Sequence, residues 1–402
     1  MNLPVATPLA QWREAAHASL QRGELQQAAA LFQRILEQLP DDVEALQVLG
    51  TAQLAAGDFS AAAQTLQQAL QRAPELFVER LRLGVALERL DRPQDALTAY
   101  FGALRTAQNQ GRWLGDDTTA PGLRDAVKHS MRYVDAGRPA WFRQVLEPLQ
   151  QRYGVAQMRR VADCLASYLG ERPVATPDPR QRPKFLYFPG LPSQPYYPRE
   201  RFPWHAELEA ATASIRQELQ AVLAQRDSLE AFLDAPPPGQ MQQAMLQSSG
   251  PQPAAWDAYF FYRHGERYDA HAAACPRTAA LLDGLPLTRI PGHAPETLFS
   301  VLTPGTHILP HTGVTNLRLV THLPLLVPAD CALCVGGELH AWREGHCVTF
   351  DDTFEHEAWN RSAETRVVLI LDSWNPDLTD AERVAVTELI EAIGQFNRAS
   401  GA

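Results

Sequence analysis

Cysteine is scarce in this chain, and long apolar runs are lacking altogether. Five cysteines in 402 residues are an odd, small number, which suits a reducing compartment better than a disulfide-stabilised secreted protein. No apolar stretch approaches the roughly 20 residues that a membrane-spanning helix needs. The first residues lack the basic segment and apolar run of a secretory signal. We therefore expect a cytoplasmic protein without a membrane segment.

Basic residues are also fewer than acidic ones. Lysine and arginine number 36 against 46 acidic residues, and the net charge is −10. Because no lysine- or arginine-rich run offsets this balance, the composition argues against nucleic-acid binding. No phosphate-binding loop, dinucleotide fingerprint or G-x-S-x-G motif stands in a convincing context. Protein, peptide and small-molecule partners remain open, and the length predicts two or three domains.

The first hundred residues repeat with a period of 34, which is the period of the tetratricopeptide repeat. Each such unit is a pair of antiparallel helices, and small residues let the paired helices approach closely. The pattern predicts an all-α solenoid whose groove could receive a protein or peptide. The alternative is that the repeats only pack on the next domain. The matched positions are Gly23 and Gly57; Ala28, Ala62 and Ala96; Leu36, Leu70 and Leu104; Pro40 and Pro74; and Gly50 and Gly84.

Composition divides the chain into three regions. Residues 1–109 are the repeat region, and residues 110–182 are a helical connector that ends in the proline-rich stretch "ERPVATPDPRQRP". In residues 183–402, and above all from residue 297, short apolar runs alternate with glycine and proline turns. This texture predicts a jelly roll (a double-stranded β-helix) with flanking helices. His264-Gly265 predicts a hairpin turn, and Thr379 with Glu382 predicts a capping box.

Histidine is concentrated in the last region, where seven of the twelve lie between residues 293 and 356. His311 and His356 each stand beside a predicted strand, so two distant strands could bring them together. Non-haem iron sites commonly combine two histidines with a carboxylate two residues after the first of them, but Gly313 occupies that place here. His307 is a weaker candidate for a direct role.

Arg366 lies in the apolar run "TRVVLIL", where an unpaired guanidinium would be costly. A buried arginine implies a carboxylate partner, because its planar fork matches that group. If the carboxylate belongs to a ligand, the ligand is an organic acid beside a metal. Two histidines followed by such an arginine are the order expected for a 2-oxoglutarate oxygenase.

From residue 183 to about residue 390 the chain resembles the aspartyl/asparaginyl β-hydroxylase family. The stretches that carry the resemblance are "YFPGLP", "SVLTPGTHILPHTGVTNLRLVTHLPL", "HCVTFDDTFEHEAWN" and "RVVLILDSWNPDLT". The repeats ahead of this region are similar to those in the larger members. In that family iron is held by two histidines, with glycine in place of the acid.

The resemblance implies a set of site residues. His311 and His356 would bind Fe(II), and O2 would be the oxidant. Ser300 and Arg366 would hold the 5-carboxylate of 2-oxoglutarate, and His322 would lie near its 1-carboxylate end. Asp351 and Asp352 could seem to supply the missing acid, but hydrogen bonding around the ligands is the more ordinary role of such residues.

One position departs from the family pattern. Where the family commonly has Arg-x-Arg-x-His, this chain has Arg318, Val320 and His322. The second arginine helps hold the cosubstrate, so its loss puts cosubstrate affinity or the identity of the acid in doubt. We expect Arg318 to compensate and count it among the cosubstrate-binding residues.

The resemblance implies hydroxylation of the β-carbon of aspartate or asparagine residues in a peptide or protein, which the repeats could present. A related oxygenase acting on a small molecule is an alternative, by hydroxylation or by halogenation at the position that Gly313 leaves vacant. A non-catalytic repeat scaffold with a ligand-binding jelly roll is the other alternative.

Overall fold

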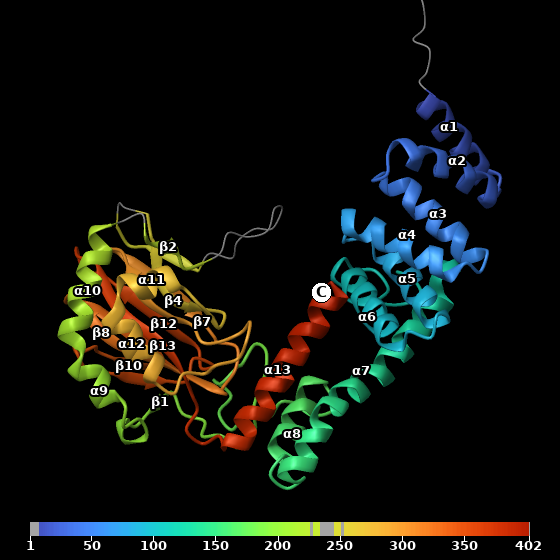
Figure 1. Cartoon of the computed structure of the whole chain (residues 1–402). Coiled ribbons are helices and arrows are strands. Elements are labelled where there is room, and N and C mark those ends of the chain that lie inside the picture. The colour runs from blue at the N-terminus through green and yellow to red at the C-terminus, as the bar shows by residue number, and fades with distance from the viewer. Residues whose placement is uncertain (1–7, 226–227, 234–244, 251–252, 402) are drawn as a thin grey trace, which may run out of the picture. The chain divides into compact units, whose positions relative to one another are not determined.

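The computed structural model describes residues 8–225, 228–233, 245–250 and 253–401. The chain divides into two compact units, one of residues 1–144 with 392–402 and one of residues 145–391 (Figure 1). In the four described ranges, every helix is too short or too polar to serve as a membrane span.

The first unit is built from helical pairs, as the period of 34 predicts. Six consecutive helices follow one another, and each packs on the next. Their bounds are α1 (Pro8–Gln21), α2 (Leu25–Gln38), α3 (Val43–Ala55), α4 (Phe59–Arg72), α5 (Phe77–Arg89) and α6 (Pro93–Asn109). A short 3-10 helix, η1 (Pro121–Leu123), precedes α7 (Arg124–Tyr153), whose last residues belong to the second unit, as does α8 (Arg159–Tyr168).

Small residues of the repeat stand where helices touch. A Cβ atom added to Gly50 would lie 2.8 Å from the Leu66 side chain, and one added to Gly84 would lie 2.4 Å from Tyr100. Larger residues at these positions would force the paired helices apart. In the third repeat Asp91 adopts a φ of +56°, at the turn where the first two repeats have glycine. The predicted tetratricopeptide-like architecture is confirmed.

The second unit contains two antiparallel sheets. The larger runs β1 (Tyr196–Tyr197), β11 (Val348–Phe350), β8 (Arg318–Leu326), β13 (Arg366–Trp374), β6 (Thr297–Leu302), β4 (Trp256–Arg263) and β2 (Glu230–Ala231), with β5 (Glu266–Arg267) paired to β4. The smaller runs β10 (Glu338–His340), β9 (Cys331–Val335), β12 (His356–Asn360), β7 (Thr306–His311) and β3 (Leu246–Ser248). The flanking helices are η2 (Arg199–Arg201), α9 (His205–Ala210), α10 (Thr212–Ala224), α11 (Asp269–Ala274), α12 (Pro276–Gly284) and α13 (Asp380–Ser400).

Strand alternation gives the larger sheet two different faces. On β13, Val367 and Leu369 pack in the core that contains Ile215 of α10 and Leu282 of α12. Val368, between them, packs instead with Leu333 of the smaller sheet. Helices therefore cover the outer face of the larger sheet, and the smaller sheet lies against its inner face.

Two local predictions, a hairpin turn and a helix capping box, are confirmed. His264 and Gly265 form a two-residue loop between β4 and β5, with φ of +51° and +79°. Positive φ at both loop residues is typical of a tight hairpin. At the start of α13 the Glu382 backbone N–H donates to Thr379 Oγ1 at 3.2 Å, and the Thr379 N–H donates to Glu382 Oε2 at 2.9 Å. These two bonds are the capping box.

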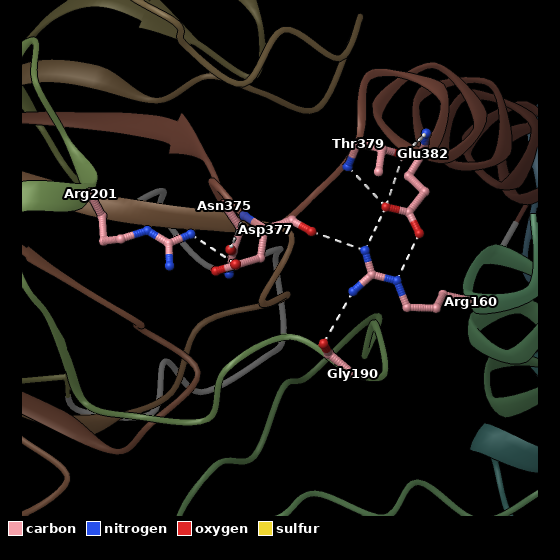
Figure 2. Close-up of polar contacts among 7 residues, drawn as sticks. All are labelled: Arg160, Gly190, Arg201, Asn375, Asp377, Thr379 and Glu382. Atoms are coloured by element: carbon pink, nitrogen blue, oxygen red, sulfur yellow. Dashed lines mark hydrogen bonds and ion pairs between the residues drawn. The ribbon is translucent and has the colours of Figure 1, made fainter. Parts of the chain in front are cut away.

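The capping glutamate has a second partner, Arg160 of α8 (Figure 2). Arg160 Nε and Nη2 donate to the two Glu382 carboxylate oxygens at 2.7 and 2.6 Å. The same guanidinium donates to the backbone carbonyls of Gly190 and Asp377. The helix α8, which precedes residue 183, is thus tied to the segment that follows the last strand. The boundary expected near residue 183 stays a prediction.

We expect Arg160→Ala to lower the free energy of unfolding of the second unit by about 2–3 kcal/mol, because it leaves a buried carboxylate without its cation. Arg201→Ala is the matched control, since Arg201 pairs with Asp377 at 2.8 Å through side chains that are 41% and 28% exposed. That exposed pair should contribute less than about 1 kcal/mol. Urea unfolding would compare the two variants, and equal losses would contradict the role given to Arg160.

Candidate functional site

A cavity of about 140 Å³ lies between the two sheets. Its wall on the larger sheet comes from alternate positions of β6, β8 and β13, which share one face because successive side chains point to opposite sides. Its other wall comes from β7, β9 and β12 of the smaller sheet. All six nominated residues line it: Ser300, His311, Arg318, His322, His356 and Arg366.

His311 and His356 meet because their strands pair. They are direct partners in the β7–β12 register, so their side chains leave the same face of the sheet, and their ring centroids lie 4.1 Å apart. Each ring is fixed by its own strand: Nδ1 donates to the carbonyl two residues earlier, at 2.8 Å for His311 and 3.0 Å for His356. Since a carbonyl only accepts, Nδ1 carries the proton and Nε2 keeps its lone pair.

Electrostatics also favours neutral imidazoles here. Burial lowers the pKa of His311 to about 4, helped by the neighbouring His356, and burial lowers the pKa of His356 as well. Neutral imidazole with an oriented ring is the form that binds metals. Within the described part of the chain, no group of three or more His, Cys, Asp or Glu side chains is arranged to hold a metal. A metal here would therefore rest on two protein ligands.

The space beside Gly313 is filled from another segment. A Cβ atom added to Gly313 would lie 2.2 Å from the Asp352 carboxylate carbon, and the Gly313 N–H donates to the Asp352 carbonyl at 2.6 Å. Asp352 Oδ2 lies 3.2 Å from Arg318 Nη2, and among the described residues Oδ1 has no hydrogen-bond partner. A carboxylate therefore stands where the missing acid's side chain would begin.

This close approach makes Gly313→Ala informative. We expect the variant to lose about 1–3 kcal/mol of stability, because the methyl group would displace the Asp352 carboxylate or the backbone. The double variant with Asp352→Ala should recover part of that loss, since it removes the overlapping atoms. Thermal unfolding of both proteins would test the contact. A Gly313→Ala protein as stable as the parent would show that the space is not filled.

Arg366 is buried without a carboxylate. Arg366 is 1% exposed. Its Nη1 donates to Ser300 Oγ at 3.3 Å, and its guanidinium carbon lies 4.9 Å from the centre of the Trp342 ring. Among the described residues Arg366 forms no ion pair with an acid, and its Nε has no hydrogen-bond partner. Burial lowers its pKa to about 10. Such a cation is expensive alone, so the site fits an anionic ligand.

Two residues near Arg366, Ser300 and His322, also have aromatic neighbours that fix their side chains. Ser300 Oγ accepts from Trp256 Nε1 at 2.9 Å, which orients the hydroxyl. His322 lies between Trp342 and Phe350, and burial lowers its pKa well below the usual value, so it is neutral. Sequence reasoning missed both tryptophans. Trp256 could have been found by following the alternation of its strand, whereas Trp342 comes from a loop without such a signal.

Arg318 reaches the cavity, but its guanidinium is already bound. Nη1 lies 2.8 Å from Asp372 Oδ1 and Nη2 lies 3.2 Å from Asp352 Oδ2. Burial opposes its charge, yet these two carboxylates raise its pKa. Val320, the residue in place of the family arginine, is 7% exposed and presents only methyl groups. The geometry does not favour the compensation expected of Arg318.

Comparison with known proteins adds a family likeness. Residues 209–376 match the model of the aspartyl/asparaginyl β-hydroxylase family, and residues 19–77 match a tetratricopeptide-repeat model. Aspartate β-hydroxylase domain-containing protein 2 of Xenopus tropicalis is 35% identical over 254 residues, which are 61% of this chain and 64% of that protein. Its Rattus norvegicus counterpart is 34% identical over 60% of this chain and 68% of that protein. The ornithine lipid ester-linked acyl 2-hydroxylase of Rhizobium tropici is 34% identical over 48% and 64%. The matched residues 209–376 include the whole set of six nominated side chains.

Proposed function

The chain belongs to the aspartyl/asparaginyl β-hydroxylase family, and from this premise we propose that it is an Fe(II)- and 2-oxoglutarate-dependent hydroxylase. One observation supports the proposal: two neutral imidazoles share a single cavity with a buried guanidinium that has no carboxylate partner among the described residues. The imidazoles suit a divalent metal, and the guanidinium suits the far end of a dicarboxylic acid.

Each residue then has a defined task. His311 and His356 would hold Fe(II) through Nε2, while Ser300 and Arg366 would hold the 5-carboxylate of 2-oxoglutarate and His322 would lie toward its other end. Metal and cosubstrate together would supply the oxidation in which substrate C–H, O2 and 2-oxoglutarate give C–OH, succinate and CO2. The protein orients these groups and keeps bulk water from them. Asp352, held by Arg318, would keep negative charge beside the histidines.

The two-sheet unit supports a jelly roll, a double-stranded β-helix that opens between its sheets. We assign the oxygenase domain to residues 183–402, with the connector in residues 110–182 and the repeats in residues 1–109. For the substrate, the family likeness supports the β-carbon of aspartate or asparagine in a peptide or protein that the repeats present. The Rhizobium relative is named for an acyl 2-position. The β-carbon of aspartate or asparagine and the 2-carbon of an acyl chain are each bonded to a carbonyl carbon. We therefore propose a C–H bond beside a carbonyl carbon as the reactive group.

The vacant position of Gly313 does not favour halogenation here, because the Asp352 carboxylate occupies the adjoining space and would repel a halide. A scaffold that binds an organic acid without turnover would also use the buried charge of Arg366, so succinate formation is the observation that separates it from the enzyme.

The decisive experiment measures succinate from the purified protein incubated with Fe(II), 2-oxoglutarate, O2 and a mixture of peptides that contain aspartate and asparagine. We expect succinate to form only when both iron and 2-oxoglutarate are present, and a chelator should stop it. Succinate formation that survives the chelator, or that never occurs, would reject the proposal.

A further inference from the structure

One segment of the chain, residues 181–188 (the brace), forms hydrogen bonds with both loops that adjoin the candidate metal ligands. Residues 312–317 follow His311 at the end of β7, and residues 351–355 precede His356 at the start of β12. The pairing of β7 with β12 fixes the backbone of the two histidines. The loops that lead away from this pair are held by the brace.

The first loop is bound to the brace by backbone and side chain. The Phe185 N–H donates to the Val314 carbonyl at 2.9 Å. The Asn316 side chain, which is buried, uses both ends of its amide: Oδ1 accepts from the Phe188 N–H at 2.8 Å, and Nδ2 donates to the Phe188 carbonyl at 2.9 Å. Both backbone groups of one brace residue are therefore bonded to the loop that follows His311.

Gln181 joins the brace to the second loop. Its Nε2 donates to Asp351 Oδ2 at 2.8 Å, and its Oε1 accepts from Ser193 Oγ at 2.8 Å. The other oxygen of Asp351 accepts from the Thr353 N–H at 2.9 Å, a local bond that shapes the turn before His356. Gln181 and Asp351 are both buried, so this amide holds a carboxylate that has left water.

The brace also holds the carbonyl that orients His356. His356 Nδ1 donates to the Phe354 carbonyl, and Phe354 is paired with Gln181 in an isolated antiparallel bridge. Asp352, in the same loop, carries the carboxylate beside Gly313. Groups that orient a metal ligand must themselves be held to within about 0.5 Å. A shift of this loop would turn the His356 ring and move the Asp352 carboxylate together.

We propose that the brace is a positioning element of the metal site and that Gln181 is its principal positioning residue. The inference rests on the proposed hydroxylase function and extends its machinery to a segment outside the known family region. The brace precedes residues 209–376, which match the family model, and the boundary expected near residue 183 would divide it. Gln181 acts through the second loop and does not itself bind metal.

Gln181→Met tests the proposal, because it removes both hydrogen bonds of the amide and keeps the length of the side chain. We expect the purified variant to bind Fe(II) about tenfold more weakly in anaerobic equilibrium dialysis, as when a group that orients a metal ligand is lost. At saturating iron, its KM for 2-oxoglutarate should stay close to that of the parent, since Ser300 and Arg366 lie on β6 and β13.

Thr278→Val is the matched control. Thr278 is likewise buried, and its Oγ1 donates to the Glu218 carboxylate at 2.6 Å between two outer helices, α12 and α10. Both variants lose a buried hydrogen bond to a carboxylate, so both should unfold at a lower temperature. Only Gln181→Met should weaken Fe(II) binding, and only there should hydrogen exchange in residues 351–355 of the metal-free protein become faster.

Ser193→Ala provides a second route if Gln181→Met does not fold. It removes only the hydrogen bond that orients Gln181 Oε1, and it should weaken Fe(II) binding by about threefold. Unchanged Fe(II) affinity in that variant would then overturn the inference.

Fe(II) affinity equal to that of the parent in a folded Gln181→Met protein would overturn the inference and leave the hydroxylase proposal intact. An equal loss of affinity in Thr278→Val would overturn it as well, because the effect would then follow stability alone. A parent protein that binds no Fe(II) would instead reject the proposed function on which the inference rests.

Discussion

Replacing His311 or His356 by alanine should lower iron-dependent succinate formation by about a thousandfold or more, as expected when about 4 kcal/mol of metal-derived stabilisation is lost. Either variant removes one of the two imidazoles that pair across β7 and β12. Because the described residues offer no third histidine, cysteine or acid arranged to complete a metal group with them, a single remaining ligand would not retain the metal. The fold should persist, since both rings are only half-buried and bond locally to their own strands.

The measurement combines bound iron, succinate yield and thermal unfolding. His307→Ala is the matched control, because His307 lies on the same strand but pairs with Glu357 at 2.7 Å and does not line the cavity. It should keep both iron and activity. Activity retained in His311→Ala, or lost equally in His307→Ala, would reject the ligand assignment.

Replacing Arg366 by methionine should weaken the binding of 2-oxoglutarate and raise the stability of the protein without it. The concentration of 2-oxoglutarate needed for half-maximal turnover should rise by about tenfold or more, since a charged hydrogen-bonded pair contributes about 1.5–3 kcal/mol. Without cosubstrate, however, the variant should be more stable than the parent by about 1–3 kcal/mol, because a buried cation lacking a carboxylate is replaced by an apolar chain of similar length.

Thermal unfolding with and without 2-oxoglutarate separates these effects. The parent protein should gain stability on adding the cosubstrate, and the variant should gain little. Arg216→Met is a suitable control, because Arg216 lies in the same unit but contacts Glu344 and the Leu325 carbonyl. An unchanged 2-oxoglutarate requirement in Arg366→Met would mean that the arginine serves packing.

The opposite effects expected on cosubstrate binding and on stability have a structural reason. The fold places Arg366 among Ser300, Trp256 and Trp342, none of which carries a negative charge. A binding site that is prepared for an anion must carry an uncompensated cation until the anion arrives. Stability lost in the empty state is therefore the expected counterpart of binding in the loaded state.

Local patterns in the sequence were sufficient for part of this architecture. The period of 34 places glycine at the repeat turns and at the close helix contacts of Gly50 and Gly84, because each repeat obeys the same short-range packing. Alternation within one strand likewise puts Arg366 and Asp372 on the same face, since that rule needs only neighbouring residues. Two histidines and an arginine near predicted strands were enough to nominate a metal and an organic acid.

Other features depended on which strands became neighbours. That His311 faces His356 follows from the register of β7 against β12, and a slip of one residue would send one ring to the other side. The Asp352 carboxylate beside Gly313, and the capture of Arg318 by Asp352 and Asp372, join segments far apart in the chain. The sequence alone determined which chemical groups this protein has and which local faces they share. Only the tertiary structure decided which charges neutralise one another and which one stays unpaired, because these pairings depend on distances between segments that no local pattern encodes.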